Sequence, residues 1–277
     1  MRRFEGLLFG LPGLLVLAGV VGVPLFYTLG ISLTRYTFLR PRWDWIGFQN
    51  YFGLLQDAYF VHALTVSAVY VALTVGLSLG LGLLLAVLLQ QPVPLRGLHY
   101  FAVSLPMLIA PVGVGLIWKM LLHPELGPLG RLMGLDFLGD ARLALLTLAL
   151  IDVWQQVSLV ALILLAGLRS LPKEPLEAAF VDGATPFQRF RYITLPLLRP
   201  VLLILLILQT VAELRTYDLV YVLTRGGPGS ATELVSYFIY RKAFLGLDLS
   251  AASAMAFVLL LLSLGLVAFY YRLMMRD

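Results

Sequence analysis

Residues Leu171–Pro200 read LPKEPLEAAFVDGATPFQRFRYITLPLLRP and form a charged segment between two long apolar runs. A bilayer core contains no water to satisfy charged groups or irregular backbone, and crossing it takes about 20 predominantly apolar residues. This segment is therefore expected at one face of a membrane. The apolar runs on either side of it are expected to cross that membrane as helices.

The same segment has the local pattern of two short helices joined by a turn. Pro175 suits a first helical turn, and Glu177–Ala179 is good helix-forming sequence. Asp182–Gly183 is expected to end this helix, and Thr185–Pro186 is expected to cap and begin the next one. Pro196 is expected to break the second helix before the following apolar run. The pattern alone leaves two interpretations open, a docking surface beside the membrane or a simple connection between spans.

The composition indicates an integral membrane protein. The 277 residues are 60% hydrophobic and 13% charged, with a mean hydropathy of +0.92, whereas soluble domains are about 25% charged. The chain has no cysteine, which excludes disulfides and thiolate metal sites. The net charge of +5 needs no partner beyond lipid headgroups and neighbouring subunits, and it does not indicate nucleic-acid binding.

Six apolar runs are long enough to cross a bilayer, so the sequence predicts an all-α protein with six transmembrane helices in a single domain, residues 1–277. The predicted spans are roughly Leu7–Leu33, Ala63–Leu89, Leu98–Leu122, Leu143–Ala166, Val201–Leu223 and Ala251–Met274. Pro106 and Pro111 should distort the third span, which is tolerated where neighbouring groups satisfy the freed carbonyls. Six spans put both termini and the Leu171–Pro200 loop on one face. Lys and Arg are divided almost evenly between the two faces, so their distribution does not decide which face is cytoplasmic.

Two groups of polar residues lie inside predicted spans, where a charge costs roughly 2.5–3.5 kcal/mol and should face protein or water. One group is spaced i, i+3, i+4 in the fourth span, and the other recurs every four residues in the fifth. The candidate pathway residues are Asp152, Gln155, Gln156, Gln209, Glu213 and Tyr217. They either line a hydrated solute pathway or make structural hydrogen bonds between helices. Arg215 lies off this stripe and is expected to reach Asp218.

The loop resembles a known family at the level of individual residues. Glu177-Ala178-Ala179, Asp182-Gly183-Ala184, Phe190, Ile193 and Leu195-Pro196 match the EAA loop of permease subunits of binding-protein-dependent ABC importers. In that family the two short helices form the element that enters a cleft on the ATP-binding subunit. The resemblance implies a helix-turn-helix coupling loop, about residues 171–200, between spans 4 and 5. The implied ATPase-coupling residues are Glu177, Ala178, Ala179, Asp182, Gly183 and Ala184.

A second motif follows the fifth span. Gly226–Gly229 is a strong turn signal, and no Gly-Lys-Ser/Thr follows it, so it is not a phosphate-binding P-loop. It resembles the TGGGP outer loop of carbohydrate-type ABC permeases, with Arg225 in place of the first glycine. Ser236–Phe244 and Gly47–Tyr51 also resemble that branch, which imports oligosaccharides and glycerol phosphates. Gly76 and Gly80 form a small-xxx-small pair in the second span, either for a partner subunit or for packing within the chain.

The resemblance implies a set of partners and a location. The partners are a second, related permease, two ATP-binding subunits and an external solute-binding protein, and the outer loops Phe38–Val61 and Gly226–Asp248 are expected to meet the last of these. The chain itself is expected to bind no cofactor, because ATP and Mg belong to the partner ATPase. The implied location is the bacterial or archaeal cytoplasmic membrane, with both termini and the loop on the cytoplasmic side.

The sequence pattern has two other interpretations as to function class. An autonomous secondary transporter would use Asp152, Glu213 or Asp218 as its titrating group. A membrane enzyme is disfavoured, because the three histidines have no metal-binding spacing and there is no cysteine nucleophile. The sequence therefore favours a transporter subunit that performs no bond-breaking chemistry.

Overall fold

The computed structural model describes residues 11–91 and 94–275. By their contacts these residues form two compact units. Unit 1 contains the described residues up to Val61 together with Phe238–Leu261, and unit 2 contains His62–Tyr237 together with the described residues from Leu262 onward.

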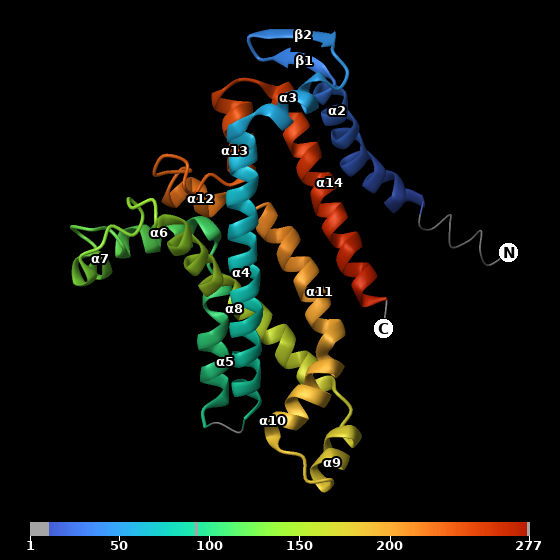
Figure 1. Cartoon of the computed structure of the whole chain (residues 1–277), viewed down its shortest axis with the longest axis vertical. Coiled ribbons are helices and arrows are strands. Elements are labelled where there is room, and N and C mark those ends of the chain that lie inside the picture. Colours follow the sequence, from blue (N-terminus) through green and yellow to red (C-terminus); the bar gives the residue numbers. More distant parts are fainter. Residues whose placement is uncertain (1–10, 92–93, 276–277) are drawn as a thin grey trace, which may run out of the picture. The chain divides into compact units, whose positions relative to one another are not determined.

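The described residues are almost entirely helical (Figure 1). In chain order the elements are η1 (Ala18–Gly22), α2 (Val23–Ser32), β1 (Thr34–Thr37), β2 (Arg40–Trp45), α3 (Gln49–Gln56), α4 (Ala58–Gln90), α5 (Arg96–Ser104), η2 (Pro106–Leu108), α6 (Pro111–Leu121), α7 (Pro128–Met133), α8 (Ala144–Ser170), α9 (Glu174–Val181), α10 (Pro186–Arg189), η3 (Phe190–Thr194), α11 (Leu195–Leu214), α12 (Asp218–Leu223), α13 (Val235–Tyr240), η4 (Arg241–Leu245) and α14 (Leu249–Met274). Here η2 is a 3₁₀ turn, and η1, η3 and η4 are π-helical turns.

Five helical stretches within the described residues are long and apolar enough to cross a membrane. They are Leu11–Ser32, Ala58–Gln90, Ala144–Ser170, Pro186–Leu223 and Leu249–Leu273. They correspond to five of the six predicted spans. The predicted span Leu98–Leu122, which was expected to be distorted at Pro106 and Pro111, is not one long helix but is divided into α5, η2 and the short apolar helix α6.

The two prolines explain this division. Proline has no N–H to donate to a helical ladder, and it pushes the preceding residue toward extended conformation. Ile109 and Ala110, which lie between η2 and Pro111, are both extended, with ψ of 130° and 143°. The freed carbonyl of Ile109 accepts a 2.7 Å hydrogen bond from Nε2 of Gln155 on α8. The expectation that a neighbouring helix would satisfy a freed carbonyl is confirmed at this position.

The loop between α8 and α11 contains the predicted pair of short helices, here called the elbow (residues 171–194). Gly183 has φ +79° and follows the last residues of α9, as expected for a helix-ending glycine. Thr185 caps α10: its Oγ1 accepts the N–H of Gln188 at 3.3 Å, while Gln188 Oε1 accepts the N–H of Thr185 at 2.8 Å. The guanidinium of Arg189 lies 5.2 Å from the ring centre of Phe180 and so joins the two helices.

The predicted break at Pro196 does not occur. Helical structure continues from α10 through η3 into α11, and Pro196 lies in the first turn of α11. The N–H of Leu195 donates to the carbonyl of Phe190, five residues back. This wider π-helical turn lets the chain pass the proline without ending the helix. The elbow is thereby continuous with a helix that ends only at Leu214.

Unit 1 contains a small sheet that the all-α prediction lacks. Strands β1 and β2 pair antiparallel, with Thr34 opposite Trp45 and Thr37 opposite Arg40 (Figure 1). Two fastenings hold this hairpin within the unit. Asn50 Nδ2 donates to the carbonyl of Thr34 at 2.9 Å. The N–H of Tyr36 donates to Ser250 Oγ at 2.6 Å, and that hydroxyl donates back to the Tyr36 carbonyl at 3.1 Å.

Unit 2 has two chemically distinct ends. At the elbow end a buried apolar cluster packs the last turns of α4 and α8 against the start of α11, through Leu89, Leu168 and Leu198 among others. At the opposite end α4 binds the first residue of α13, where Ser67 Oγ accepts the N–H of Val235 at 2.8 Å. The chain order of α4, α8 and α11 therefore determines which loops lie together at the same end of unit 2.

Candidate functional site

The elbow presents a surface that no described residue covers. Glu177, Ala178, Asp182 and Gly183 are exposed, while Ala179 and Ala184 are half-buried. Beside them lie large apolar side chains at high exposure, Phe180 at 67%, Val181 at 83%, Phe187 at 73% and Tyr192 at 72%. Contiguous exposed apolar surface of this kind is typical of an interaction site. The matched loop motif gives no role to Val181 or Tyr192.

A buried polar cluster joins three of the long helices of unit 2. Asp152 on α8 and Glu213 on α11 are each only 2% exposed, and their carboxyl groups lie within hydrogen-bonding reach of each other. The hydroxyl of Tyr70 on α4 donates to Asp152 Oδ2. Thr216 Oγ1 donates to Glu213 Oε2 at 3.1 Å. Since each buried carboxyl group has hydroxyl donors, the cluster fastens α4, α8 and α11 together.

Sequence reasoning missed Tyr70, although it named both Asp152 and Glu213 as candidate pathway residues. The available signal was weak. Tyr70 is one of several polar residues in a largely apolar helix, and it lies 82 residues from Asp152 in the chain. Nothing in the spacing of either span relates them.

The two glutamines of the fourth span have different environments. Gln155 binds the freed carbonyl of Ile109, and both it and Gln156 line an open groove of about 450 Å³ beside residues 107–111. Gln156 also lies within hydrogen-bonding reach of Glu213. The predicted face of α8 therefore divides: Asp152 is turned into the three-helix cluster, while the amides reach the groove formed at the break in the third predicted span.

The predicted stripe on the fifth span is only partly present. Gln209 and Glu213 are both buried on α11, and within the described residues the Nε2 of Gln209 has no hydrogen-bond partner. Tyr217 does not continue the stripe, because α11 ends at Leu214 and Tyr217 precedes α12. Its ring instead stacks against Tyr221 at 5.5 Å and Tyr237 at 6.1 Å.

Arg215 and Asp218 do not form the expected contact. Arg215 ends α11 with a φ of −103°, so the helical spacing of i, i+3 does not hold between them. No ion pair joins the two side chains in the part of the chain that the structure describes.

The glycine-rich segment at the opposite end of unit 2 is a tight, internally bonded turn. Gly226 has φ +83° and Gly229 has φ +63°, and the Gly227–Pro228 peptide is cis. Thr232 Oγ1 lies 2.6 Å from the Gly227 carbonyl oxygen. Arg225, which stands where the resembled pattern has glycine, itself has φ +52°. The backbone thus keeps a conformation suited to glycine although the side chain is arginine.

The described residues offer no arrangement for a metal ion, since they contain no group of three or more His, Asp or Glu side chains that could hold one. The polar chemistry of the site consists of amides, hydroxyls and one carboxyl pair. Such groups bind hydroxyl-rich solutes and hold helices together.

Residues 78–276 match the protein family described as the binding-protein-dependent transport system inner membrane component. The trehalose/maltose transport system permease protein MalF of Thermococcus litoralis is 32% identical over 273 residues, which cover 96% of this chain and 92% of the relative. The sn-glycerol-3-phosphate transport system permease protein UgpA of Pectobacterium atrosepticum is 31% identical over 240 residues, covering 84% and 81%.

Solved structures with the same fold include two of a bacterial ABC transporter for alginate. A crystal structure of the transporter, which imports the acidic polysaccharide alginate, matches with a TM-score of 0.80 at 21% identity and covers 100% of both chains. A second, in complex with the alginate pentasaccharide-bound periplasmic protein, matches with a TM-score of 0.85 over 99% of this chain and 96% of that one. At this identity the likeness concerns the fold.

Proposed function

The chain belongs to the family of binding-protein-dependent transport system inner membrane components, and we propose that it forms one half of the solute pathway of a carbohydrate importer. As a permease subunit of an ABC importer it is a transporter component and not an enzyme. The proposed solute is an oligosaccharide or a glycerol phosphate. Relatives named for trehalose/maltose and for sn-glycerol-3-phosphate support this class.

The observation that carries the mechanism is the exposed elbow. Glu177, Ala178, Asp182 and Gly183 lie on its surface next to uncovered apolar side chains. We infer that this surface docks on a partner ATPase, which binds ATP and Mg, while this chain binds no cofactor. Movement of the elbow is passed directly to α11, because helical structure runs without a break from Pro186 to Leu214. Alternating access then follows from movement of α11 relative to its neighbours.

The proposed topology follows from the elbow. If it meets a cytoplasmic ATPase, the elbow end of unit 2 is cytoplasmic and the Gly226–Gly229 end is external. The broken segment made of α5, η2 and α6 then serves as the sixth crossing, which puts both termini on the cytoplasmic side. A crossing with extended backbone at Ile109 and Ala110 needs polar neighbours, and the hydrogen bond from Gln155 supplies one.

The groove beside residues 107–111 is the proposed solute-facing surface. Gln155 and Gln156 bring amides to it, and amides both donate to and accept from sugar hydroxyls. A second, related permease would face this groove and complete the pathway. Asp152 and Glu213 lie behind it in the three-helix cluster, so their proposed role is to hold the helices that form the pathway.

The remaining proposed partners are two ATP-binding subunits and an external solute-binding protein that delivers the solute. The family description supports the binding protein. So does the related alginate transporter, whose structure includes a periplasmic protein carrying alginate pentasaccharide.

A reconstitution experiment tests the proposal. The chain is assembled with its second permease and ATPase in proteoliposomes, and uptake of the solute held by the binding protein is measured. Glu177→Lys should abolish uptake while the chain stays in the membrane, whereas Glu125→Lys, the same charge change at another exposed site, should not. Normal uptake by the Glu177 variant would remove the coupling role. Uptake by the chain alone, without ATPase or nucleotide, would instead favour a secondary transporter.

A further inference from the structure

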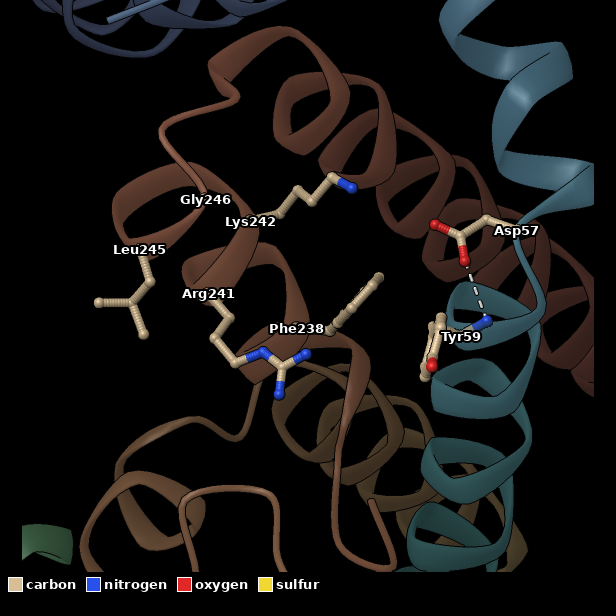
Figure 2. Close-up of a pocket in the computed structure, with 7 residues that line it drawn as sticks. All are labelled: Asp57, Tyr59, Phe238, Arg241, Lys242, Leu245 and Gly246. Carbon is tan, nitrogen blue, oxygen red and sulfur yellow. Dashed lines mark hydrogen bonds between the residues drawn. The ribbon is translucent and has the colours of Figure 1, made fainter. Parts of the chain in front are cut away.

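The groove beside residues 107–111 combines two amides with an apolar lining and contains no cation. Its lining residues are Met107, Leu108, Ile109, Ala110, Pro111, Gln155, Gln156 and Leu159. Cationic side chains line a different cavity, of about 430 Å³, within unit 1, where Figure 2 shows Arg241 and Lys242 in the same pocket as Asp57. Within the part of the chain that the structure describes, the groove therefore offers an anion no opposite charge.

The amide of Gln155 is oriented by the extended backbone between η2 and α6. Its Nε2 donates to the Ile109 carbonyl at 2.7 Å. A carbonyl oxygen only accepts, so the nitrogen of the amide must be the atom turned toward it. The Oε1 atom of Gln155 makes no hydrogen bond to the residues that the structure describes and stays accessible in the groove. Gln155 thus brings a free acceptor to the groove.

The amide of Gln156 is oriented in the same sense by the buried carboxyl pair. It lies within hydrogen-bonding reach of Glu213, while the hydroxyls of Tyr70 and Thr216 donate to Asp152 and Glu213 respectively. Two facing buried carboxyl groups share one proton and keep one negative charge, because two like charges side by side are too costly to bury. Such a pair accepts from the amide nitrogen of Gln156, which leaves the amide oxygen for the groove.

We propose that this groove selects a neutral, hydroxyl-rich solute, an oligosaccharide, and rejects a phosphate ester such as a glycerol phosphate. This inference rests on the proposed function and chooses between the solute classes for which the relatives are named. Sugar hydroxyls donate to the amide oxygens of Gln155 and Gln156. The apolar side chains of Leu108 and Leu159, which are 66% and 41% exposed, meet the C–H faces of the sugar rings.

An anionic solute meets three obstacles in the same groove. It loses water without gaining a cation. It faces amide oxygens, which carry partial negative charge, and it approaches the charge held by the carboxyl pair behind Gln156. A neutral hydroxyl meets none of these obstacles. The orientation of the two amides is therefore the source of the discrimination, which works by repelling the wrong solute as well as by binding the right one.

The absence of cysteine from the chain permits a direct measurement of the charge in the groove. Met107→Cys places a single thiol there, and its rates of reaction with a cationic and an anionic methanethiosulfonate reagent are measured in a complex whose other subunits lack cysteine. Relative to a free thiol, the cationic reagent should be favoured at least about fivefold, and less in high salt. Leu245→Cys, beside Arg241 and Lys242 in the pocket of Figure 2, is the reference, where this preference should be absent or reversed.

Solute occupancy is measured as the slowing of labelling of the same thiol by an uncharged maleimide. Trehalose and maltose should protect the thiol, and sn-glycerol 3-phosphate should need at least about a tenfold higher concentration for the same protection. Gln156→Arg should narrow this difference, because it adds a cation to the groove. Gln56→Arg makes the same change at an exposed residue at the end of α3, outside the groove, and should leave the difference unchanged.

Two results overturn the inference and leave the proposed function in place: equal protection by sn-glycerol 3-phosphate and by the sugars, or faster reaction of the anionic reagent. If Met107→Cys does not assemble, Leu108→Cys in the same groove provides the same measurements. If none of these probes protects the thiol although the complex imports solute from its binding protein, the proposed pathway through this groove fails together with the inference.

Discussion

Gly183 gives a graded test of how the elbow works. Its φ of +79° lies in the region that L side chains rarely adopt, yet a Cβ built on it would meet nothing within 4 Å. Any cost of substitution therefore comes from the backbone and not from a clash. A non-glycine residue held in this region costs of the order of 1–3 kcal/mol, least for Asn and most for a β-branched residue.

The expected order of activity is therefore Gly183, then Gly183→Asn, Gly183→Ala and Gly183→Val. A cost of one to two kcal/mol corresponds to about a 5- to 30-fold change in the population of the native turn. The assay is ATP hydrolysis by the assembled importer in proteoliposomes, with solute uptake measured in parallel. Gly76→Ala is the matched control, because Gly76 lies within helix α4 without a positive φ and also has open space around its Cβ.

Two results would each refute this reasoning. If Gly183→Val couples hydrolysis to uptake as well as wild type, the left-handed turn is not needed for docking. If Gly183→Asn is as defective as Gly183→Val, the loss comes from the presence of any side chain at the ATPase contact and not from the backbone. Only the graded order supports the conformational reasoning.

Three further predictions concern stability and packing. Arg225→Gly should stabilise the chain by about 1 kcal/mol, because Arg225 has φ +52°, and a rise in the thermal unfolding midpoint in detergent would show it. Tyr70→Phe should destabilise by about 1–3 kcal/mol by leaving Asp152 without its hydroxyl donor; an unchanged midpoint would mean that this bond does not fasten the helices. Gly82→Leu should reduce folded yield more than Gly80→Leu, because a Cβ at Gly82 would lie 2.5 Å from Val160 Cγ1, whereas a Cβ at Gly80 would meet nothing within 4 Å; equal yields of the two variants would contradict the close α4–α8 packing.

Features set by neighbouring residues were predictable from the sequence. The capping box at Thr185, the turn at Gly183 and the disturbance at Pro106 and Pro111 depend on groups only a few residues apart. Such local chemistry acts in the same way whatever the rest of the fold does. The extent of the disturbance was not predictable, because it depended on Gln155 being placed to satisfy the Ile109 carbonyl.

Features set by distant contacts were not predictable. Tyr70 and Asp152 meet only because α4 packs on α8, and no spacing in either helix encodes that pairing. Close packing at glycines was equally unpredictable. Gly76 and Gly80 have the small-xxx-small spacing, yet a Cβ at either position would meet nothing within 4 Å. Gly82 belongs to no such motif, yet it lies against Val160. The hairpin is a third case, since the segment Arg40–Trp45 becomes a strand by pairing with Thr34–Thr37 and has no extended apolar alternation of its own.

Helix α8 contacts both the end of α11 and the extended backbone between η2 and α6. Through Asp152 it is tied to α4 and to the end of α11, which is continuous with the elbow. Through Gln155, three residues further, it is tied to the extended backbone at Ile109. Because these two positions are neighbours on one helical face, a shift of α11 that strains the carboxyl pair also acts on the helix that holds the broken segment. A groove lined by Gln155 and Gln156 can therefore change shape when the elbow moves, without either amide touching the elbow.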